Sequence, residues 1–204
     1  MALERRTLVH RSKRGACTTG RPGDRGDGLG TISSRAPPTR TGRCSTQPAA
    51  RCALGGSCTR RCEKHLQQLD GLVDRGAVLT LWERVASTRP WSGPLLWIHG
   101  DLHPGNLLVS GGRLSAVIDF GDLAAGDPAT DLSVAWMLLP PPARSTFRAS
   151  ARGAFDPIDD DTWMRARGWA LALGLAYLAS SRDDAVLAAL GRATIDAALN
   201  DTPE

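Results

Sequence analysis

With 204 residues, of which 42% are hydrophobic, the chain is long enough to form one ordinary domain with a core. Its formal net charge of +4 is unevenly divided, because residues 1–62 carry 13 Lys and Arg against three acids, whereas residues 63–204 carry 12 against 18. The acidic second part argues against a nucleic-acid-binding domain there. The sequence also has no apolar run of about 18 residues, which a membrane span requires, and no apolar stretch of signal-peptide length after its basic start.

The first segment, residues 1–65, is rich in Arg, Gly, Ser, Thr and Pro and has neither helical nor strand periodicity, so we expect it to be disordered. It also contains all five cysteines. Their absence from residues 66–204 suits a reducing cytosol, which predicts a cytoplasmic protein.

Three interpretations of this segment compete. It could be a basic arm for nucleic acid or acidic surfaces, although interleaved aromatic residues are missing. It could form a metal knuckle, although the spacing of the four candidate ligands fits no paired Cys-x₂-Cys pattern: Cys52, Cys58, Cys62 and His65. We favour the third interpretation, in which a GC-rich gene has been translated out of frame or upstream of its true start.

From Leu66 to about Ala86, apolar residues recur at roughly helical spacing and predict one or two helices. A turn region with two prolines follows over residues 88–94. Residues 95–98 form a short, fully apolar strand candidate, and residues 106–118 are predicted to form a β-hairpin around Ser110-Gly-Gly112.

Four further helices are predicted, over residues 131–139, 143–154, 162–180 and 184–200. The second half of the third is apolar nearly all round, which indicates a central position in the core. The acidic run 159–161 before it is interpreted as helix capping, with attraction of cationic substrates as the alternative. The predicted fold class is therefore α+β and mostly helical.

The strongest chemical signal is the loop His99-Gly-Asp-Leu-His-Pro-Gly-Asn106, followed by Val117-Ile-Asp-Phe-Gly-Asp122. Asp101, Asn106 and Asp119 form an oxygen-ligand set that suits Mg²⁺ together with one base acting on a hydroxyl, as phosphoryl transfer requires. Two plainer interpretations compete with this one. The histidines of the loop with Asp101 could bind a transition metal, and Asp119-Phe-Gly could be only a turn at the end of a strand.

These motifs, with Gly126-Asp-Pro-Ala-Thr-Asp131 after them, resemble the aminoglycoside phosphotransferase family, a branch of the protein-kinase-like fold. The resemblance is strongest over residues 95–136 and extends over about residues 66–199. It implies a phosphotransferase C-terminal lobe over residues 66–204, with a short β-hairpin carrying the metal ligands. It also implies ATP or GTP with Mg²⁺ as cofactors and the hydroxyl of a small molecule as acceptor.

The resemblance also implies residue roles. Asp101 would accept or orient the proton of the acceptor hydroxyl, while Asn106 and Asp119 would bind Mg²⁺ and, through it, the nucleotide phosphates. Structural support of the loop is expected from four further residues: His99, His103, Asp127 and Asp131. Among these, Asp131 is predicted to cap a helix and Asp127 to brace the loop.

In the family, an N-terminal β-rich lobe supplies a strand lysine for the nucleotide. This chain has two lysines, Lys13 and Lys64, and neither lies in an apolar strand pattern. We therefore expect a truncated enzyme of the antibiotic-resistance type with very weak or no activity on its own. The alternatives are a non-catalytic module that retains the fold and binds a small molecule and, far behind, a basic-tailed nucleic-acid-binding protein. The sequence does not distinguish between acceptors, between ATP and GTP, or between oligomeric states.

Overall fold

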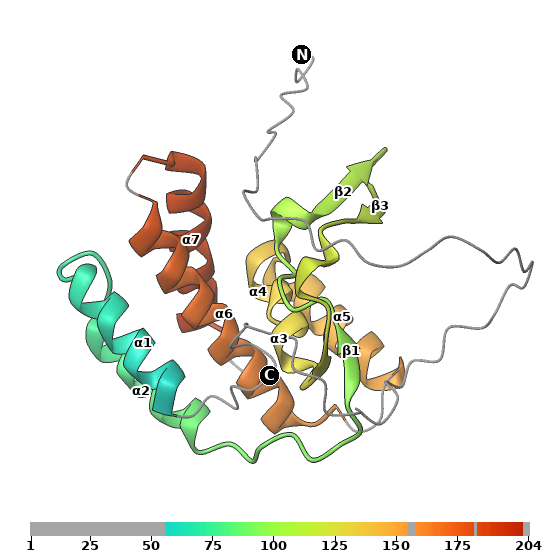
Figure 1. Ribbon diagram of the computed structural model, residues 1–204, viewed down its shortest axis with the longest axis horizontal. Coiled ribbons are helices and arrows are strands. Elements are labelled where there is room, and N and C mark those ends of the chain that lie inside the picture. Colours follow the sequence, from blue (N-terminus) through green and yellow to red (C-terminus); the bar gives the residue numbers. More distant parts are fainter. Residues whose placement is uncertain (1–55, 155–157, 182, 202–204) are drawn as a thin grey trace, which may run out of the picture. The chain divides into compact units, whose positions relative to one another are not determined.

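The computed structural model describes residues 56–154, 158–181 and 183–201, all of which belong to one compact unit. These residues form seven α-helices, four short strands and two 3₁₀ turns (Figure 1). The mostly helical α+β class predicted from the sequence is confirmed. In chain order the elements are α1 (Gly56–Gln68), α2 (Arg75–Ala86), β1 (Leu96–Ile98), η2 (Pro104–Asn106), β2 (Leu107–Ser110), β3 (Arg113–Val117), η3 (Phe120–Asp122), β4 (Ala124–Gly126), α3 (Ala129–Leu132), α4 (Val134–Leu138), α5 (Pro141–Ala154), α6 (Asp160–Ser180) and α7 (Ala185–Leu199).

Helix α1 begins at Gly56, ten residues before the predicted start at Leu66. The helix is mostly polar, and its buried apolar positions, Cys62 and Leu66, are too few to show a clear period in the sequence. Burial, reinforced by the neighbouring charge of Glu63, raises the pKa of the Cys62 thiol to about 11, which disfavours the thiolate that a metal knuckle needs. The other predictions for residues 1–55 lie outside the described residues.

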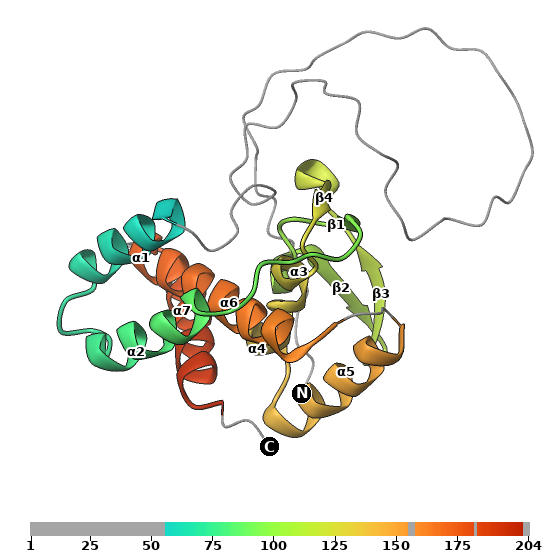
Figure 2. The same cartoon turned by 90° about the horizontal axis from the view of Figure 1, so that it is seen from below.

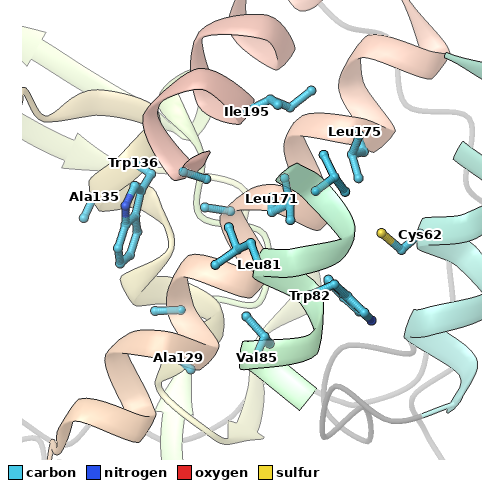
Figure 3. Packing of buried hydrophobic residues seen from close by; sticks show 14 of the residues in the cluster. Cys62, Leu81, Trp82, Val85, Ala129, Ala135, Trp136, Leu171, Leu175 and Ile195 are labelled. Atoms are coloured by element: carbon cyan, nitrogen blue, oxygen red, sulfur yellow. The ribbon is translucent and has the colours of Figure 1, made fainter. Parts of the chain in front are cut away.

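Helix α6 is the centre of the core. It packs against α1, α2, α3, α4 and α7, and Figure 3 shows Leu171 and Leu175 among the buried side chains that these neighbours contribute. Both leucines are fully buried. The central position predicted for this helix from its apolar second half is therefore confirmed. Its N-cap is also as predicted, because the Asp159 carboxylate accepts hydrogen bonds from the backbone N–H and the hydroxyl of Thr162.

The strands form two antiparallel pairs (Figure 2). Strand β1 pairs with β4, placing Ile98 opposite Ala124, and the predicted hairpin is the pair β2–β3, in which Leu107 lies opposite Val117. Its turn uses Gly111 and Gly112, both with positive φ. Strand β4 was not predicted, because its Ala-Ala-Gly sequence has little strand propensity.

The helix predicted over residues 131–139 is instead two short helices, α3 and α4, which meet at Ser133. The Ser133 hydroxyl donates to the Thr130 carbonyl, an i−3 bond that competes with regular helical pairing. Helix α5 begins at Pro141 rather than near residue 143, because proline is accommodated in the first turn of a helix, where its missing N–H costs nothing. In the part of the chain that the structure describes, no helix is both long and apolar enough to cross a bilayer.

Close packing of α6 on α7 depends on Gly191. A Cβ added there would lie 2.7 Å from the backbone nitrogen of Leu178 and 2.8 Å from the carbonyl oxygen of Gly174. These contacts are with backbone atoms, so neither helix can yield without moving as a whole. We expect Gly191→Ala to destabilise the fold by about 1–3 kcal/mol in urea unfolding, despite the better helix propensity of alanine.

Gly76 in α2 is the matched control, because a Cβ there would meet only the cap oxygen of Asp74, at an ordinary 3.4 Å. Gly76→Ala should leave stability unchanged or raise it by up to about 1 kcal/mol. Equal effects of the two substitutions would contradict the backbone-contact explanation.

Candidate active site

The loop over residues 99–106 is attached to helix α3 through one carboxylate. Strand β1 delivers the chain into the loop, and the backbone N–H groups of His99 and Gly100 donate to the two oxygens of Asp131 at 2.6 and 3.0 Å. Burial raises the pKa of Asp131, and the two backbone N–H donors offset part of that rise. The start of the loop is therefore fixed by a partly buried carboxylate.

The imidazole of His99 is buried and links the loop to the segment that carries Asp119. Its Nδ1 accepts from the backbone N–H of Asp101 at 3.3 Å, so its Nε2 carries the proton and donates to the carbonyl of Ile118 at 2.9 Å. The ring of Phe120 lies against it, with the centroids 4.8 Å apart. Both ring nitrogens are engaged by the backbone, which leaves neither free to bind a metal or to act as a base.

Asn106 is buried between the same two segments. Its side-chain N–H donates to the backbone carbonyl of Asp101 at 2.8 Å. The backbone carbonyl of Asn106 accepts from the backbone N–H of Ile118 at 3.0 Å. With the amide nitrogen used in this way, the remaining polar atom of the side chain is the amide oxygen Oδ1, the atom that suits a hard cation.

The carboxylate of Asp101 is about half-exposed, with 42% of the side chain accessible, and its Oδ2 lies 3.8 Å from Nε2 of His103. His103 is oriented by its own local contact, since its Nδ1 accepts from the backbone N–H of Gly105 at the start of η2. Asp101 thus has an accessible oxygen and no Lys or Arg partner among the described residues.

Asp119 is the one non-glycine residue with a positive φ in the described part of the chain, at 63°. Such a left-handed conformation costs about 1–3 kcal/mol, although aspartate tolerates it better than most residues. The exposed Asp119 carboxylate does not cap the η3 turn that follows. The left-handed conformation of Asp119 instead turns the chain directly after Ile118. The backbone of Ile118 is hydrogen-bonded to both His99 and Asn106.

Gly100 explains why the two segments approach so closely. Its φ is +83°, and a Cβ there would lie 2.4 Å from the carbonyl oxygen of Asp122. Only glycine fits both the conformation and the contact. The structure therefore brings the loop with Asp101 and Asn106 against the turn with Asp119 through hydrogen bonds and direct backbone contact.

The roles predicted for Asp127 and Asp131, bracing the loop and capping a helix, are found the other way round. Asp131 braces the loop, whereas Asp127 accepts from the backbone N–H of Ala129 at the start of α3 and from Nε of Arg165 at 2.7 Å. Arg165 is buried in α6, so this ion pair ties α3 to the core helix. Spacing along the chain could not reveal this difference, because Asp127 lies two residues before α3 and Asp131 lies within it, so both are near the same short helix.

Tyr177 is a site residue that the sequence analysis missed. It is the single tyrosine of the chain, lies in α6 and places its ring 6.0 Å from the ring of His103. Its hydroxyl is buried with no hydrogen-bond partner among the described residues, and burial, with a contribution from the charge of Asp101, raises its pKa. A polar residue in an otherwise apolar helix half was the one signal that could have identified it.

A metal cage made of protein residues is absent from the described ranges, where no three His, Cys, Asp or Glu side chains gather in a way that could hold an ion. The predicted ligands Asn106 and Asp119 offer one amide oxygen and one carboxylate. This small oxygen set fits Mg²⁺, which keeps several waters and takes further ligands from substrate phosphates, and it does not fit a transition metal.

Asp131→Asn should loosen the loop, because a carboxamide has one accepting oxygen for the two N–H groups of His99 and Gly100. We expect a loss of about 1–3 kcal/mol in urea unfolding and faster amide exchange at both residues. Asp70→Asn, at an exposed position, is the control and should change neither. Unchanged amide hydrogen exchange at His99 and Gly100 in Asp131→Asn would contradict the conclusion that Asp131 holds the loop in place.

The same variant tests the pKa of Asp131. Because that pKa is raised in the folded state, the folded protein binds the proton more tightly than the unfolded chain does. The wild-type free energy of unfolding therefore falls as pH rises from about 4, the unfolded value, through the folded pKa. Asp131→Asn lacks this term, so the stability gap between the two proteins should narrow as pH rises across that window.

Comparisons with known proteins found a matching family model and a distant relative. The family model described as the phosphotransferase enzyme family (APH) matches residues 38–169, a stretch that includes the loop, the turn with Asp119 and the first half of α6. An uncharacterized protein, YcbJ of Bacillus subtilis (strain 168), is 38% identical over 71 residues, which are 30% of this chain and 23% of that relative. The chain thus covers less than a quarter of the relative's length, and no solved structure matches it. On the extent of the family match, the chain belongs to the aminoglycoside phosphotransferase family of phosphotransferase enzymes.

Proposed function

We propose that this chain carries the catalytic lobe of an ATP- or GTP-dependent phosphotransferase that moves the γ-phosphate to a hydroxyl of a small molecule, such as an aminoglycoside, an amino alcohol or a sugar. One observation carries the proposal. The loop with Asp101 and the turn with Asp119 form a single hydrogen-bonded unit, and the buried amide of Asn106 lies between them.

Asp101 is assigned as the residue that accepts or orients the proton of the acceptor hydroxyl. The half-exposed carboxylate has no Lys or Arg partner among the described residues, so its oxygen is open to an acceptor O–H, whose proton it would accept or orient as the hydroxyl attacks the phosphate. His103 and Tyr177 border it through the edge contact of their rings, and we assign them to positioning of the carboxylate and the acceptor. His99 has no remaining nitrogen for such a role and supports the loop.

Asn106 and Asp119 are assigned to Mg²⁺, with the amide oxygen of the first and the carboxylate of the second as ligands. When bound, the ion would neutralise charge on the nucleotide phosphates. Asp101 lies in the same loop as Asn106 and already places one carboxylate near the site. Because Asn106 is a neutral ligand, Asp119 adds only one more carboxylate, which limits their mutual repulsion. The strained backbone of Asp119 supports the assignment, since such strain concentrates at functional positions.

The hairpin surface supports the lobe assignment. Several large apolar side chains on β2, β3 and the following turn are exposed: Leu108, Val109, Leu114, Ile118 and Phe120. Exposed apolar patches mark surfaces at which another unit packs, and this one borders Asp119. A first lobe of the protein-kinase-like type would pack on this surface and supply the cation that anchors the nucleotide. Lys64 does not fit that part, because it lies exposed on α1.

The test is phosphate transfer from γ-labelled ATP with Mg²⁺, using the full chain and a panel of one aminoglycoside, one amino alcohol and one hexose. We expect transfer well below about 1 s⁻¹, because none of the strands that the structure describes carries a lysine to anchor the nucleotide, and a further loss of about 100-fold or more in Asp101→Asn. Asp70→Asn is the matched control and should retain the wild-type rate. Transfer that persists unchanged in Asp101→Asn would overturn the assignment of the base.

The alternative function is a non-catalytic module that binds a small molecule through the same site. The lack of a suitable lysine favours it. Magnesium-dependent binding of ATP, measured by calorimetry and lost in Asp119→Ala, would favour the enzyme. Binding of an acceptor without any binding of ATP would favour the module.

A further inference from the structure

A pocket of about 420 Å³ lies between α5, the start of α6 and the chain that follows α7. None of its lining residues belongs to the loop 99–106 or to the turn with Asp119. Helix α6 contributes Trp163 to this pocket and Tyr177 to the surroundings of the loop, and these two positions are about 21 Å apart along the helix axis. The pocket is therefore separate from the candidate active site in the residues that form it.

Arginine dominates one wall of the pocket. Arg144, Arg148 and Arg152 recur every four residues and so lie on one face of α5. The other charged lining residues are Asp160 and Asp201, which leaves the lining with an excess of one positive charge. A wall of this kind attracts anions, and guanidinium groups match the planar oxygens of carboxylates and phosphates.

Three buried N–H groups in the lining lack an acceptor within the described part of the chain: Nε of Arg144, Nε of Arg148 and Nε1 of Trp163. The tryptophan is only 5% exposed, so water does not readily satisfy its indole. All three groups can donate and none can accept. Because these atoms are closed to solvent in the empty pocket, an occupant meets instead the partly exposed side chains of Arg148 and Arg152, which are 36% and 45% accessible.

The aromatic rings indicate the rest of that occupant. The indoles of Trp136 and Trp163 lie with their centroids 6.0 Å apart, and the guanidinium of Arg148 lies 5.7 Å from the centroid of Trp163. The two indoles are tilted at 56° to each other and give the wall an apolar part, which favours an occupant with an apolar body beside its charge. We propose that this pocket binds a small organic oxyanion, a phosphate or carboxylate on an apolar body.

In the free protein, the Asp160 carboxylate pairs with the arginines that would bind the proposed oxyanion. Its carboxylate pairs with Arg148 at 2.7 Å and with Arg152, yet 80% of its side chain is exposed to solvent. Ion pairs at such exposed positions are weak, so an incoming oxyanion displaces the carboxylate at little cost. Asp201 plays a different part, because it holds the buried Arg144 and the indole N–H of Trp136 in place.

The experiment is an NMR titration of the full chain with phenyl phosphate and, separately, with benzoate, following the indole Nε1–H signals. The signal of Trp163 is assigned with Trp163→Phe. We expect that signal to shift saturably with at least one of the two anions, and the tighter one identifies the preferred oxyanion. Phenol, which has the same ring without the charge, should give no saturable shift.

Two substitutions at half-exposed or exposed positions test the charges without disturbing the core. Arg152→Gln should weaken binding about tenfold or more, because it removes a charged partner of the oxyanion. Asp160→Asn should tighten binding severalfold, because it removes the competing carboxylate. Arg113→Gln, on the exposed hairpin turn, is the matched control and should leave the affinity unchanged.

Three outcomes would overturn the proposal: no saturable shift of the Trp163 signal with either anion, equal binding of phenol, or an affinity that Arg152→Gln leaves unchanged. Weaker binding in Asp160→Asn would overturn the displacement step. The thermal unfolding midpoint of each variant is measured alongside, so that a loss of binding is attributed to the pocket only in a folded protein. The phosphate-transfer assay does not enter this test, so the pocket stands or falls independently of the proposed function.

Discussion

The contact between Asp131 and the backbone N–H groups of His99 and Gly100 is the constraint on which the site depends. It fixes the point at which strand β1 becomes the loop, and everything that follows is positioned from there. The imidazole of His99 then hydrogen-bonds the backbone carbonyl of Ile118. At the other end of the loop, the backbone carbonyl of Asn106 accepts from the N–H of Ile118. The unit therefore holds its shape through backbone groups, which leaves the side-chain oxygens of Asp101 and Asp119 available for chemistry.

Helix α6 connects this unit to the rest of the protein. Its buried Arg165 pairs with Asp127 just before α3, and about three turns farther along the helix Tyr177 lies beside His103. Because the helix is also the centre of the core, the site is supported by the most deeply buried element of the described chain. The close approach of α7 at Gly191 contributes to that rigidity, since two helix backbones in contact cannot slide without breaking the packing.

Much of the fold was predictable because local signals were strong. The hairpin followed from its glycine turn, and helix α6 followed from its apolar run and its Asp159 cap. The start of α1 was missed because two buried apolar residues in a polar helix give little periodicity, and residues 56–65 were assigned to disorder by their composition. The family match, which begins at residue 38, also extends into that segment. The parts played by Asp127 and Asp131, and the presence of Tyr177, depend on tertiary contacts over 31 to 76 residues, which spacing along the chain does not encode.

The central claim is that Asn106 and Asp119 form one cation site shared with a nucleotide. Electron paramagnetic resonance of Mn²⁺, used as a substitute for Mg²⁺, tests it most directly, because the free ion gives a strong signal that binding removes. With ATP present, the full chain should deplete the free signal beyond what ATP alone does, and Asn106→Ala and Asp119→Ala should each abolish this extra depletion, whereas Asp70→Ala should not. Extra depletion that is the same in all four proteins, or that does not require ATP, would contradict the account.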